Sequence, residues 1–323
     1  MPDRFRHEEA ERTIVFGAGA LEAADDLLGS GYTLLTTPRA ERAAPDVVER
    51  AGAVVHVPGG RVEDVAAALR PDVQGDRLVA LGGGRVVDVA KALAAADGPR
   101  EVLAIPTSLS AAEMTGSHRH ARGVPADTPR VRPRMVVNDP ALSASQPTDQ
   151  LAASTANALG HATVGLLSDR TTPIPRAVAR EAIAHLVAGW SGPEPDRSTL
   201  ALGALLAGWS IDHSGLGPHH ALAQTLVRTA GLGHAHANAA VLPASIAALR
   251  RRRAAELDRL DAELGTPLEA FARSLRERAG VRDFDGLDRL VETAAERAEL
   301  ARVAPPPDRD ELREIYREAG ASG

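Results

Sequence analysis

The stretch LGGGRVVDVAK, residues 81–91, decides the fold that we expect for this chain. It follows a short apolar run, residues 76–80, that is typical of a buried strand, and it continues into a predicted helix, residues 86–96. Strand, three glycines and helix form an arrangement that binds phosphate, because glycine lets the backbone approach a ligand and the helix N-terminus is partly positive. The alternative is a tight turn without a ligand. The motif matches neither a G-x-G-x-x-G fingerprint nor a P-loop.

Predicted strands and helices alternate on both sides of this stretch. We expect strands at residues 12–16, 32–37, 53–57, 102–106 and 135–138, and helices at 21–29, 38–51 and 62–69. This alternation is typical of a parallel, doubly wound, Rossmann-like α/β sheet, in which ligands bind beyond the carboxyl ends of the strands. Residues 1–12 are expected to form an edge strand or arm, and residues 116–134 a hairpin or mobile loop.

From about residue 142 the strand-like runs disappear and Ala- and Leu-rich helical segments continue to the C-terminus. We therefore predict two domains: a nucleotide-binding α/β domain, residues 1–141, and an all-α domain, residues 142–323. The active site is expected in the cleft between them.

Composition narrows the function classes. The chain has 323 residues, a formal net charge of −6, 2% aromatic residues and no cysteine, which excludes disulfides and thiolate ligands. Nothing resembles a nucleic-acid-binding stripe, and the basic run at residues 250–253 is interpreted as a helix C-terminus or a solvated face. Because the chain has neither the h-region of a signal peptide nor an apolar run of about 18 residues, neither a signal peptide nor a membrane span is predicted. We expect a cytoplasmic protein with a small-molecule substrate and no nucleic-acid or membrane partner.

Histidines cluster in the predicted helical domain. Asn157 and His161 are four residues apart and share one helix face, while Pro218 suits the first position of a helix that begins with His219 and His220. His234 follows His220 by fourteen residues. Imidazoles on neighbouring helices can converge on a divalent cation or on a polar substrate, although capping or core roles remain an alternative.

These motifs, in this order, resemble the iron-containing (group III) alcohol dehydrogenase family, and within it the maleylacetate reductases most closely. The resemblance covers nearly the whole chain, and its blocks are residues 15–19, 82–91, 105–108, 112–115, 139–140, 157–161, 217–220, 234–235 and 241–243. It implies a dehydroquinate synthase-like architecture, with NAD(H) or NADP(H) between the two domains. It also implies a homodimer.

The resemblance assigns roles residue by residue. The expected cofactor-binding residues are Gly82, Gly83, Gly84, Asp88, Thr107, Ser108 and Ser110, together with Thr37 and Pro38 after the second strand. The Ser/Thr loop could instead cap its own turns. No Asp or Glu ends the second strand, so the choice between NADH and NADPH stays open.

Metal-dependent members of the family bind their metal through an Asp, a His four residues later, and two His fourteen residues apart. The matching positions here are Asn157, His161, His220 and His234, of which His161, His220 and His234 remain metal candidates. Because a neutral amide is a poorer cation ligand than a carboxylate, we expect that no divalent metal is bound.

The predicted function is an NAD(P)H-dependent, maleylacetate reductase-like enzyme that reduces a small polar carbonyl or enone acid. Its candidate catalytic residues are His219, His220, His234, Asn157 and His161, with an imidazolium as the expected acid. The alternatives are a Zn- or Fe-dependent alcohol dehydrogenase, a non-reductive cyclase or rearrangement enzyme, and a non-catalytic binding protein. Arg85, Gln224 and Arg228 depart from the family pattern and leave the substrate and the level of activity open.

Overall fold

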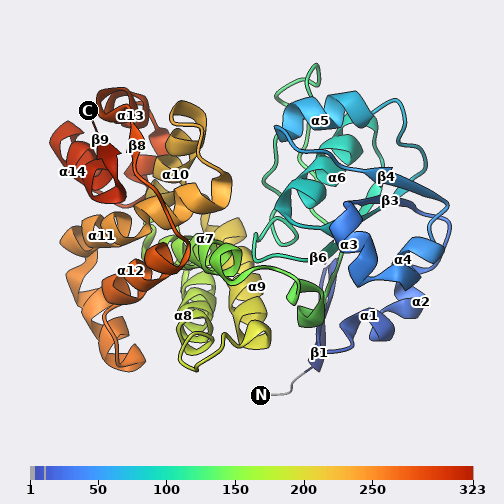
Figure 1. Ribbon diagram of the computed structural model, residues 1–323, viewed down its shortest axis with the longest axis horizontal. Helices are drawn as coiled ribbons and strands as arrows, with labels where there is room; N and C mark the ends of the chain where they lie inside the picture. The colour runs from blue at the N-terminus through green and yellow to red at the C-terminus, as the bar shows by residue number, and fades with distance from the viewer. Residues whose placement is uncertain (1–3, 11, 323) are drawn as a thin grey trace. The chain divides into compact units, whose positions relative to one another are not determined.

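The computed structural model describes residues 4–10 and 12–322, and it divides into two compact units, residues 1–146 and 147–323. The first unit contains a seven-stranded sheet with the strand order β1-β2-β7-β6-β5-β3-β4 (Figure 1). Its strands are β1 (Arg4–Glu9), β2 (Arg12–Gly17), β3 (Thr33–Thr36), β4 (Ala53–His56), β5 (Arg77–Gly82), β6 (Glu101–Pro106) and β7 (Met135–Asn138). β1 pairs antiparallel with β2 at the edge, as expected, and the remaining pairs are parallel.

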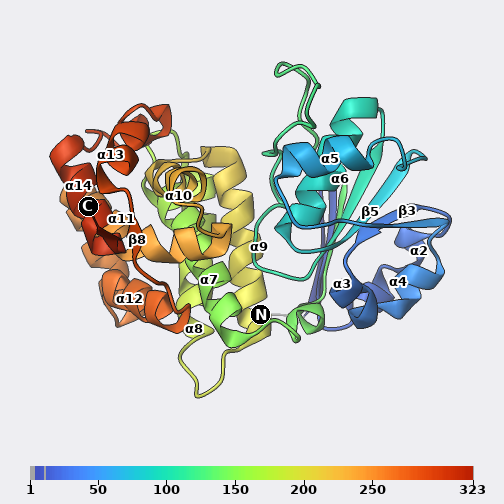
Figure 2. The same cartoon turned by 45° about the horizontal axis from the view of Figure 1, so that its top comes forward.

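Helices cover both faces of this sheet, because consecutive strand residues point to opposite sides. On β5, Leu78 and Ala80 pack with α5 (Val62–Leu69) and α6 (Gly84–Asp97). Val79 and Leu81 pack on the other face with α1 (Ala20–Ala23), α2 (Asp25–Leu28), α3 (Pro38–Ala43) and α4 (Pro45–Glu49). Figures 1 and 2 show these two helical layers. The predicted doubly wound α/β class is confirmed.

The direction of winding reverses between β3 and β5. β3 is followed by α3 on one face, whereas β5, its neighbour in the sheet, is followed by α6 on the opposite face. The two connections diverge at the carboxyl ends of these strands, and open α/β sheets bind their ligands at such a point. Thr37 and Gly83 begin the two connections, so two parts of the predicted cofactor site flank this point.

Two predicted helices are broken in the structure. The helix expected at residues 21–29 is divided at Ala24, and the one at residues 38–51 is divided at Ala44. Ala44 has φ −146° and ψ 67°, since a residue before proline, here Pro45, is driven out of the helical region. The segment between β6 and β7 contains no helix or strand, and η1 (Pro140–Ser143), a 3₁₀ turn, ends the unit.

The second unit is helical, apart from a pairing of the two-residue strands β8 (Phe284–Asp285) and β9 (Ala321–Ser322). Its helices are α7 (Thr148–Leu167), α8 (Pro173–Ala188), α9 (Arg197–Ser214), α10 (Pro218–Thr229), α11 (His234–Leu264), α12 (Leu268–Arg278), α13 (Leu287–Ala295) and α14 (Arg309–Ala319), with the 3₁₀ helix η2 (Ala298–Arg302). α7 packs against α8, α9, α11 and α12 and is buried along nearly its whole length (Figure 1). A helix that is buried all round has few positions for polar side chains, so those that it carries need an explanation.

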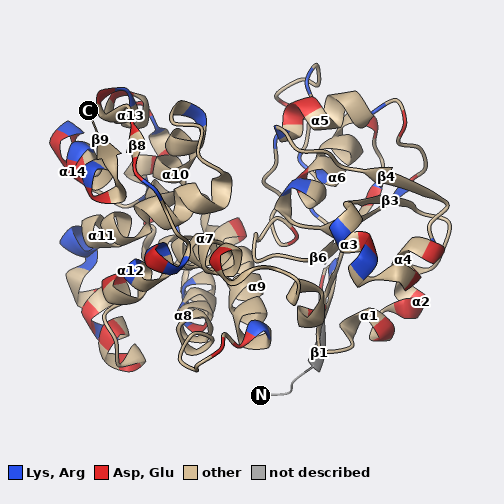
Figure 3. Ribbon diagram, in the orientation of Figure 1, with Lys and Arg blue, Asp and Glu red and all other residues tan. Residues whose placement is uncertain are grey.

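The basic run at residues 250–253 lies within α11 and is matched by acids from neighbouring segments. Arg250 pairs with Asp261 and Glu269, and Arg252 pairs with Glu311. Acidic and basic residues are interspersed on α12 and α14 as well (Figure 3). The run is therefore part of an ion-pair network inside this unit. Among the described residues, no helix is both long and apolar enough to cross a membrane.

Candidate functional sites

The three glycines lie where β5 ends and α6 begins. Gly83 is the N-cap of α6, and none of the three glycines has a positive φ. These positions lack a side chain because neighbouring residues pack closely against them, and not because the backbone is left-handed. A Cβ on Gly84 would lie 2.8 Å from the Cβ of Ser110, and one on Gly83 would lie 3.2 Å from the Ser108 hydroxyl. The glycines thus let the Ser/Thr loop after β6 lie directly against the start of α6.

That loop carries a buried polar atom that is not satisfied by the protein. Gly82 and Pro106 are partners in the sheet, and the backbone N–H of Thr107 donates to the Gly82 carbonyl at 3.0 Å. The Thr107 hydroxyl is buried, yet it has no hydrogen-bond partner among the described residues. A buried hydroxyl of this kind is costly unless a ligand or water completes it. Together with the free N–H groups of the α6 N-terminus, it fits the phosphates of a nucleotide.

Lys91, on α6, anchors the same loop, a role that the sequence motif did not reveal. Its side chain is fully buried, and its ammonium donates to the carbonyls of Ala112, Thr115 and Ser117 at 2.8, 3.0 and 2.8 Å. It also lies 2.8 Å from the Asp88 carboxylate. Asp88, predicted to bind the cofactor, is therefore the counter-ion of Lys91.

Glu113 is a second buried charge-bearing group in this loop. Its carboxyl accepts a hydrogen bond from the Ser110 hydroxyl at 3.4 Å. Burial raises the pKa of Glu113 to about 7, although its backbone hydrogen bond and Lys91 act in the opposite direction. Ala111, two residues before Glu113, has φ 64°, a left-handed conformation that costs a non-glycine residue about 1 kcal/mol or more.

Thr37, Pro38 and Arg85 also follow the carboxyl ends of strands, β3 and β5. The Thr37 side chain accepts from the Ala40 N–H at 3.3 Å and so caps α3, while Pro38 occupies the first position of that helix and is exposed. Arg85 is exposed in the first turn of α6.

In the second unit, three helices bring the predicted polar residues together. Asn157 and His161 lie on α7, His220 on the first turn of α10, and His234 at the start of α11. The ring centroids of His161 and His220 are 6.2 Å apart, and those of His220 and His234 are also 6.2 Å apart. Asn157 and His161 are buried, His220 is half-buried and His234 is exposed, so the group leads from the interior of the unit to its surface.

Two imidazole nitrogens in this group are left for a ligand. Nδ1 of His161 and Nδ1 of His220 are buried and have no hydrogen-bond partner in the described part of the chain. Other polar residues of α7 are satisfied locally, since the hydroxyls of Thr155 and Thr163 donate to carbonyls one turn earlier. The two unsatisfied nitrogens are therefore candidates for contact with a ligand or with water.

Burial disfavours charge on these rings. It lowers the pKa of His161 to about 3 and that of His219 to about 4, and it lowers the pKa of His220 well below its usual value. Neighbouring imidazoles add to the effect on His161 and His220. The expectation of an imidazolium acid does not fit these three residues, which are neutral near pH 7.

His219 takes a different place from its neighbour His220. It is 1% exposed, and both of its ring nitrogens are hydrogen-bonded: Nδ1 to the Ser245 hydroxyl at 3.1 Å and Nε2 to the Asn238 amide oxygen at 3.0 Å. Gly160 makes room for this ring, because a Cβ there would lie 2.0 Å from Cδ2 of His219. The sequence analysis gave no role to Asn238 and Ser245, which follow His234 on α11.

The predicted metal-ligand positions have a defined geometry and charge. No group of three or more His, Cys, Asp or Glu side chains within residues 4–10 and 12–322 is arranged to hold a metal ion. The four positions that the resemblance matches to metal ligands, Asn157, His161, His220 and His234, are three imidazoles and an amide, and they carry no negative charge to compensate a divalent cation.

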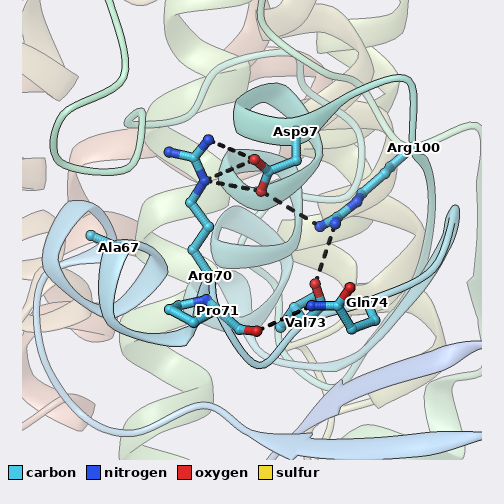
Figure 4. A pocket seen from close by; sticks show the side chains of 7 residues that line it. All are labelled: Ala67, Arg70, Pro71, Val73, Gln74, Asp97 and Arg100. Atoms are coloured by element: carbon cyan, nitrogen blue, oxygen red, sulfur yellow. Dashed lines mark hydrogen bonds and ion pairs between the residues drawn. The ribbon is translucent and has the colours of Figure 1, made fainter.

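A separate depression of about 440 Å³ lies near the amino-terminal ends of β5 and β6, where α5 and α6 end (Figure 4). Its two arginines, Arg70 and Arg100, both point toward Asp97. Arg100 also donates to the Val73 carbonyl at 3.2 Å. The charges that line the depression are thus satisfied within the protein. The depression also lies away from the carboxyl ends of the strands, where the candidate cofactor site is.

Comparison with known proteins gives this geometry a context. Residues 151–320 match the model of the Fe-containing alcohol dehydrogenase family, C-terminal. Maleylacetate reductase 1 of Cupriavidus pinatubonensis is 32% identical over 258 residues, which cover 72% of each chain. The chain belongs to the Fe-containing alcohol dehydrogenase family. It is an oxidoreductase similar to the maleylacetate reductases, and the family resemblance drawn from its motifs is confirmed.

Solved structures agree with this assignment. The crystal structure of maleylacetate reductase from Rhizobium sp. superposes with a TM-score of 0.80 and 25% identity, and the match covers 100% of both chains. Sulfoacetaldehyde reductase from Bifidobacterium kashiwanohense, solved in complex with NAD⁺, has a TM-score of 0.78 at 19% identity, with 99% of this chain and 100% of that chain covered. The latter likeness extends to the fold alone.

Proposed function

We propose that this oxidoreductase uses NADH or NADPH to reduce a small keto or enone acid of the maleylacetate type, without a metal ion. The observation that carries the proposal is the row of imidazoles on α7, α10 and α11, in a chain related to maleylacetate reductases. The α/β unit would hold the nucleotide, and the helical unit would hold the substrate.

The first unit fits the nucleotide through its backbone and hydroxyl groups. Gly83 and Gly84 expose the N-terminus of α6, and the Thr107 hydroxyl is available to a phosphate or ribose oxygen. When bound, the nicotinamide supplies the hydride. Lys91 keeps the loop of Thr107, Ser108 and Ser110 against the glycines, so the donors are in place before the ligand arrives.

The second unit fits a carbonyl that gains negative charge as hydride arrives. A neutral imidazole can donate a hydrogen bond to that oxygen, and His161 and His220 each have an unsatisfied Nδ1. His220, Gln224 and Arg228 follow one another at four-residue intervals on α10 and therefore share a face. Arg228 is exposed, and we assign it to a substrate carboxylate, which a guanidinium can bind through two hydrogen bonds.

Electrostatics supports metal independence. Asn157 stands where the metal-dependent members carry an Asp, so the three imidazoles would have to hold a divalent cation without any anionic ligand. The alternative of a Zn- or Fe-dependent dehydrogenase requires that cation.

One set of assays tests these points. We would follow NADH and NADPH oxidation with maleylacetate and related keto acids, after chelation and after addition of Zn²⁺ or Fe²⁺, and measure nucleotide binding by calorimetry. The proposal expects turnover that chelation leaves unchanged. Activity that appears only with added metal supports the dehydrogenase alternative. Failure to bind either nucleotide excludes the reductase.

His220→Gln provides the site-directed counterpart. It removes an imidazole from the row, and we expect turnover to fall at least tenfold with nucleotide affinity unchanged, because the nucleotide is held by the other unit. His185→Gln is the matched control, since His185 pairs with Glu181 on α8. Equal activity of the two variants would contradict the assigned role of the histidine row.

A further inference from the structure

Asn238 connects the buried His219 to the exposed His234. Its side chain is fully buried on α11, one turn after His234. Its amide nitrogen lies 2.8 Å from the His234 carbonyl oxygen and 3.3 Å from Nε2 of the His234 ring. Its amide oxygen lies 3.0 Å from Nε2 of His219, whose Nδ1 contacts the Ser245 hydroxyl. These contacts form one chain: Ser245, His219, Asn238, His234.

The direction of every hydrogen bond in this chain follows from one atom. The His234 carbonyl oxygen can only accept, so the amide nitrogen of Asn238, not its oxygen, must face it. The amide oxygen then faces His219, and His219 must carry its proton on Nε2 to donate to it. Nδ1 of the neutral His219 ring consequently accepts from the Ser245 hydroxyl.

The same argument fixes the ring of His234. The Asn238 amide has two N–H groups; one donates to the His234 carbonyl, which leaves the other for Nε2 of the ring, 3.3 Å from the amide nitrogen. Nε2 therefore accepts, and the ring proton lies on Nδ1. A neutral imidazole in water prefers the opposite arrangement, with its proton on Nε2, so packing alone would not produce this tautomer.

We propose that Asn238 is a positioning residue that holds His234 with its proton on Nδ1 and its Nε2 lone pair engaged by the amide. His234 then carries its hydrogen-bond donor at Nδ1, and its Nε2 is engaged by the amide. The inference deepens the proposed function, on which its catalytic meaning rests, because it gives the outermost imidazole of the row a defined donor. A metal on Nε2 would have to displace the Asn238 amide.

Nitrogen NMR of protein labelled with ¹⁵N-histidine tests the proposal without any substrate. Protonated and unprotonated ring nitrogens have distinct shifts, and the loss of one signal set in His234→Gln and in His219→Gln assigns the two rings. We expect His234 protonated on Nδ1 and His219 on Nε2. His213 is an internal control, because its Nδ1 faces the Trp209 carbonyl at 2.8 Å and must also be protonated.

Two variants extend the test. Asn238→Asp has nearly the same shape but only acceptors, so the proton of His234 should move to Nε2. Asn238→Leu removes both partners, and His234 should then adopt the Nε2-protonated form preferred in water. The His213 signals should not change in either variant. We also expect the turnover of either variant to fall by about tenfold, the factor that corresponds to one hydrogen bond.

The outcomes separate this inference from the function. A wild-type His234 protonated on Nε2, or a folded Asn238→Leu protein with an unchanged pattern, overturns the positioning role. If the variants do not fold, the wild-type spectrum alone decides. An Nδ1-protonated His234 in a protein that oxidises neither NADH nor NADPH supports the inference and rejects the proposed reaction.

Discussion

Replacement of Lys91 by methionine probes how the cofactor loop is held. Lys91 is the only lysine in the 323-residue chain, and the other residues in its Lys and Arg total are all arginines. At this position the compact ammonium, with its three donors, meets three backbone carbonyls, a geometry that the planar arginine fork does not match. Lys91→Met keeps the length and the apolar stem and removes only the charge and the donors.

The structure sets the size of the effect. Breaking a buried ion pair by removing one partner costs about 3–5 kcal/mol. We expect a value near 3 kcal/mol, because the Asp88 side chain remains 29% exposed and water can solvate it. Such a loss is large beside the stability of a typical domain, about 5–15 kcal/mol. Arg122→Met is the matched control, because Arg122 anchors the same loop to Asp64 on the surface, where an ion pair contributes about 1 kcal/mol or less.

Urea unfolding measures this loss. Far-UV circular dichroism follows both units, whereas the two tryptophans, Trp190 and Trp209, lie in the helical unit and report on it alone. Lys91→Met should lower the free energy of unfolding seen by circular dichroism and leave the tryptophan transition in place. Calorimetry should show weaker nucleotide binding. The reasoning is refuted if Lys91→Met and Arg122→Met differ by less than about 1 kcal/mol.

Three further predictions address single features of the two sites. The pKa of Glu113 rises on folding from 4.5 to about 7. As the pH is raised, the unfolded chain therefore loses this proton before the folded protein does. The free energy of unfolding then falls between these pH values, by about 3 kcal/mol in total. Glu113→Gln should therefore stabilise the protein at pH 8 and not at pH 4.5, measured by urea unfolding; parallel pH profiles would contradict this. Gly84→Ala should weaken nucleotide binding about tenfold in calorimetry, because displacing the packed serine loop costs about 1–3 kcal/mol. Gly59→Ala, where a Cβ meets nothing within 4 Å, should bind normally. Asn157→Asp should increase Zn²⁺ affinity at least tenfold in competition with a chromophoric chelator, since it adds the missing anionic ligand; wild-type protein that binds Zn²⁺ equally well would exclude metal independence.

Local patterns predicted most of the fold. The strands of the α/β unit and the glycine turn follow from apolar runs bounded by turn residues, and they lie within a residue or two of their expected positions. The breaks at Ala24 and Ala44 were not anticipated, because an apolar stripe alone does not show where short helices end. The role of Lys91 was also hidden, since its partners are more than twenty residues away and meet it only when the loop folds back over α6.

The histidine row shows a different limit. Sequence placed His219 and His220 side by side, but consecutive residues on a helix point about 100° apart, so only one of them can face His161. Gly160 decides which one turns inward, because its missing side chain leaves the space that His219 fills. That choice depends on the approach of α7 to α10, a tertiary contact that no local pattern encodes.

The same electrostatic argument connects the row of histidines to the missing carboxylate. The rings of His161 and His220 have lowered pKa values because burial and neighbouring imidazoles make positive charge unfavourable there. A divalent cation in this environment meets the same burial, and an Asp at position 157 would offset the cost of that charge whereas Asn157 does not. A negative charge that develops on a substrate oxygen needs no anionic partner. Neutral N–H donors stabilise it directly by hydrogen bonds. An amide in place of a carboxylate at position 157 thus suits a site that stabilises the oxyanion by hydrogen bonds, and this argument supports our proposal of a reduction without a metal ion.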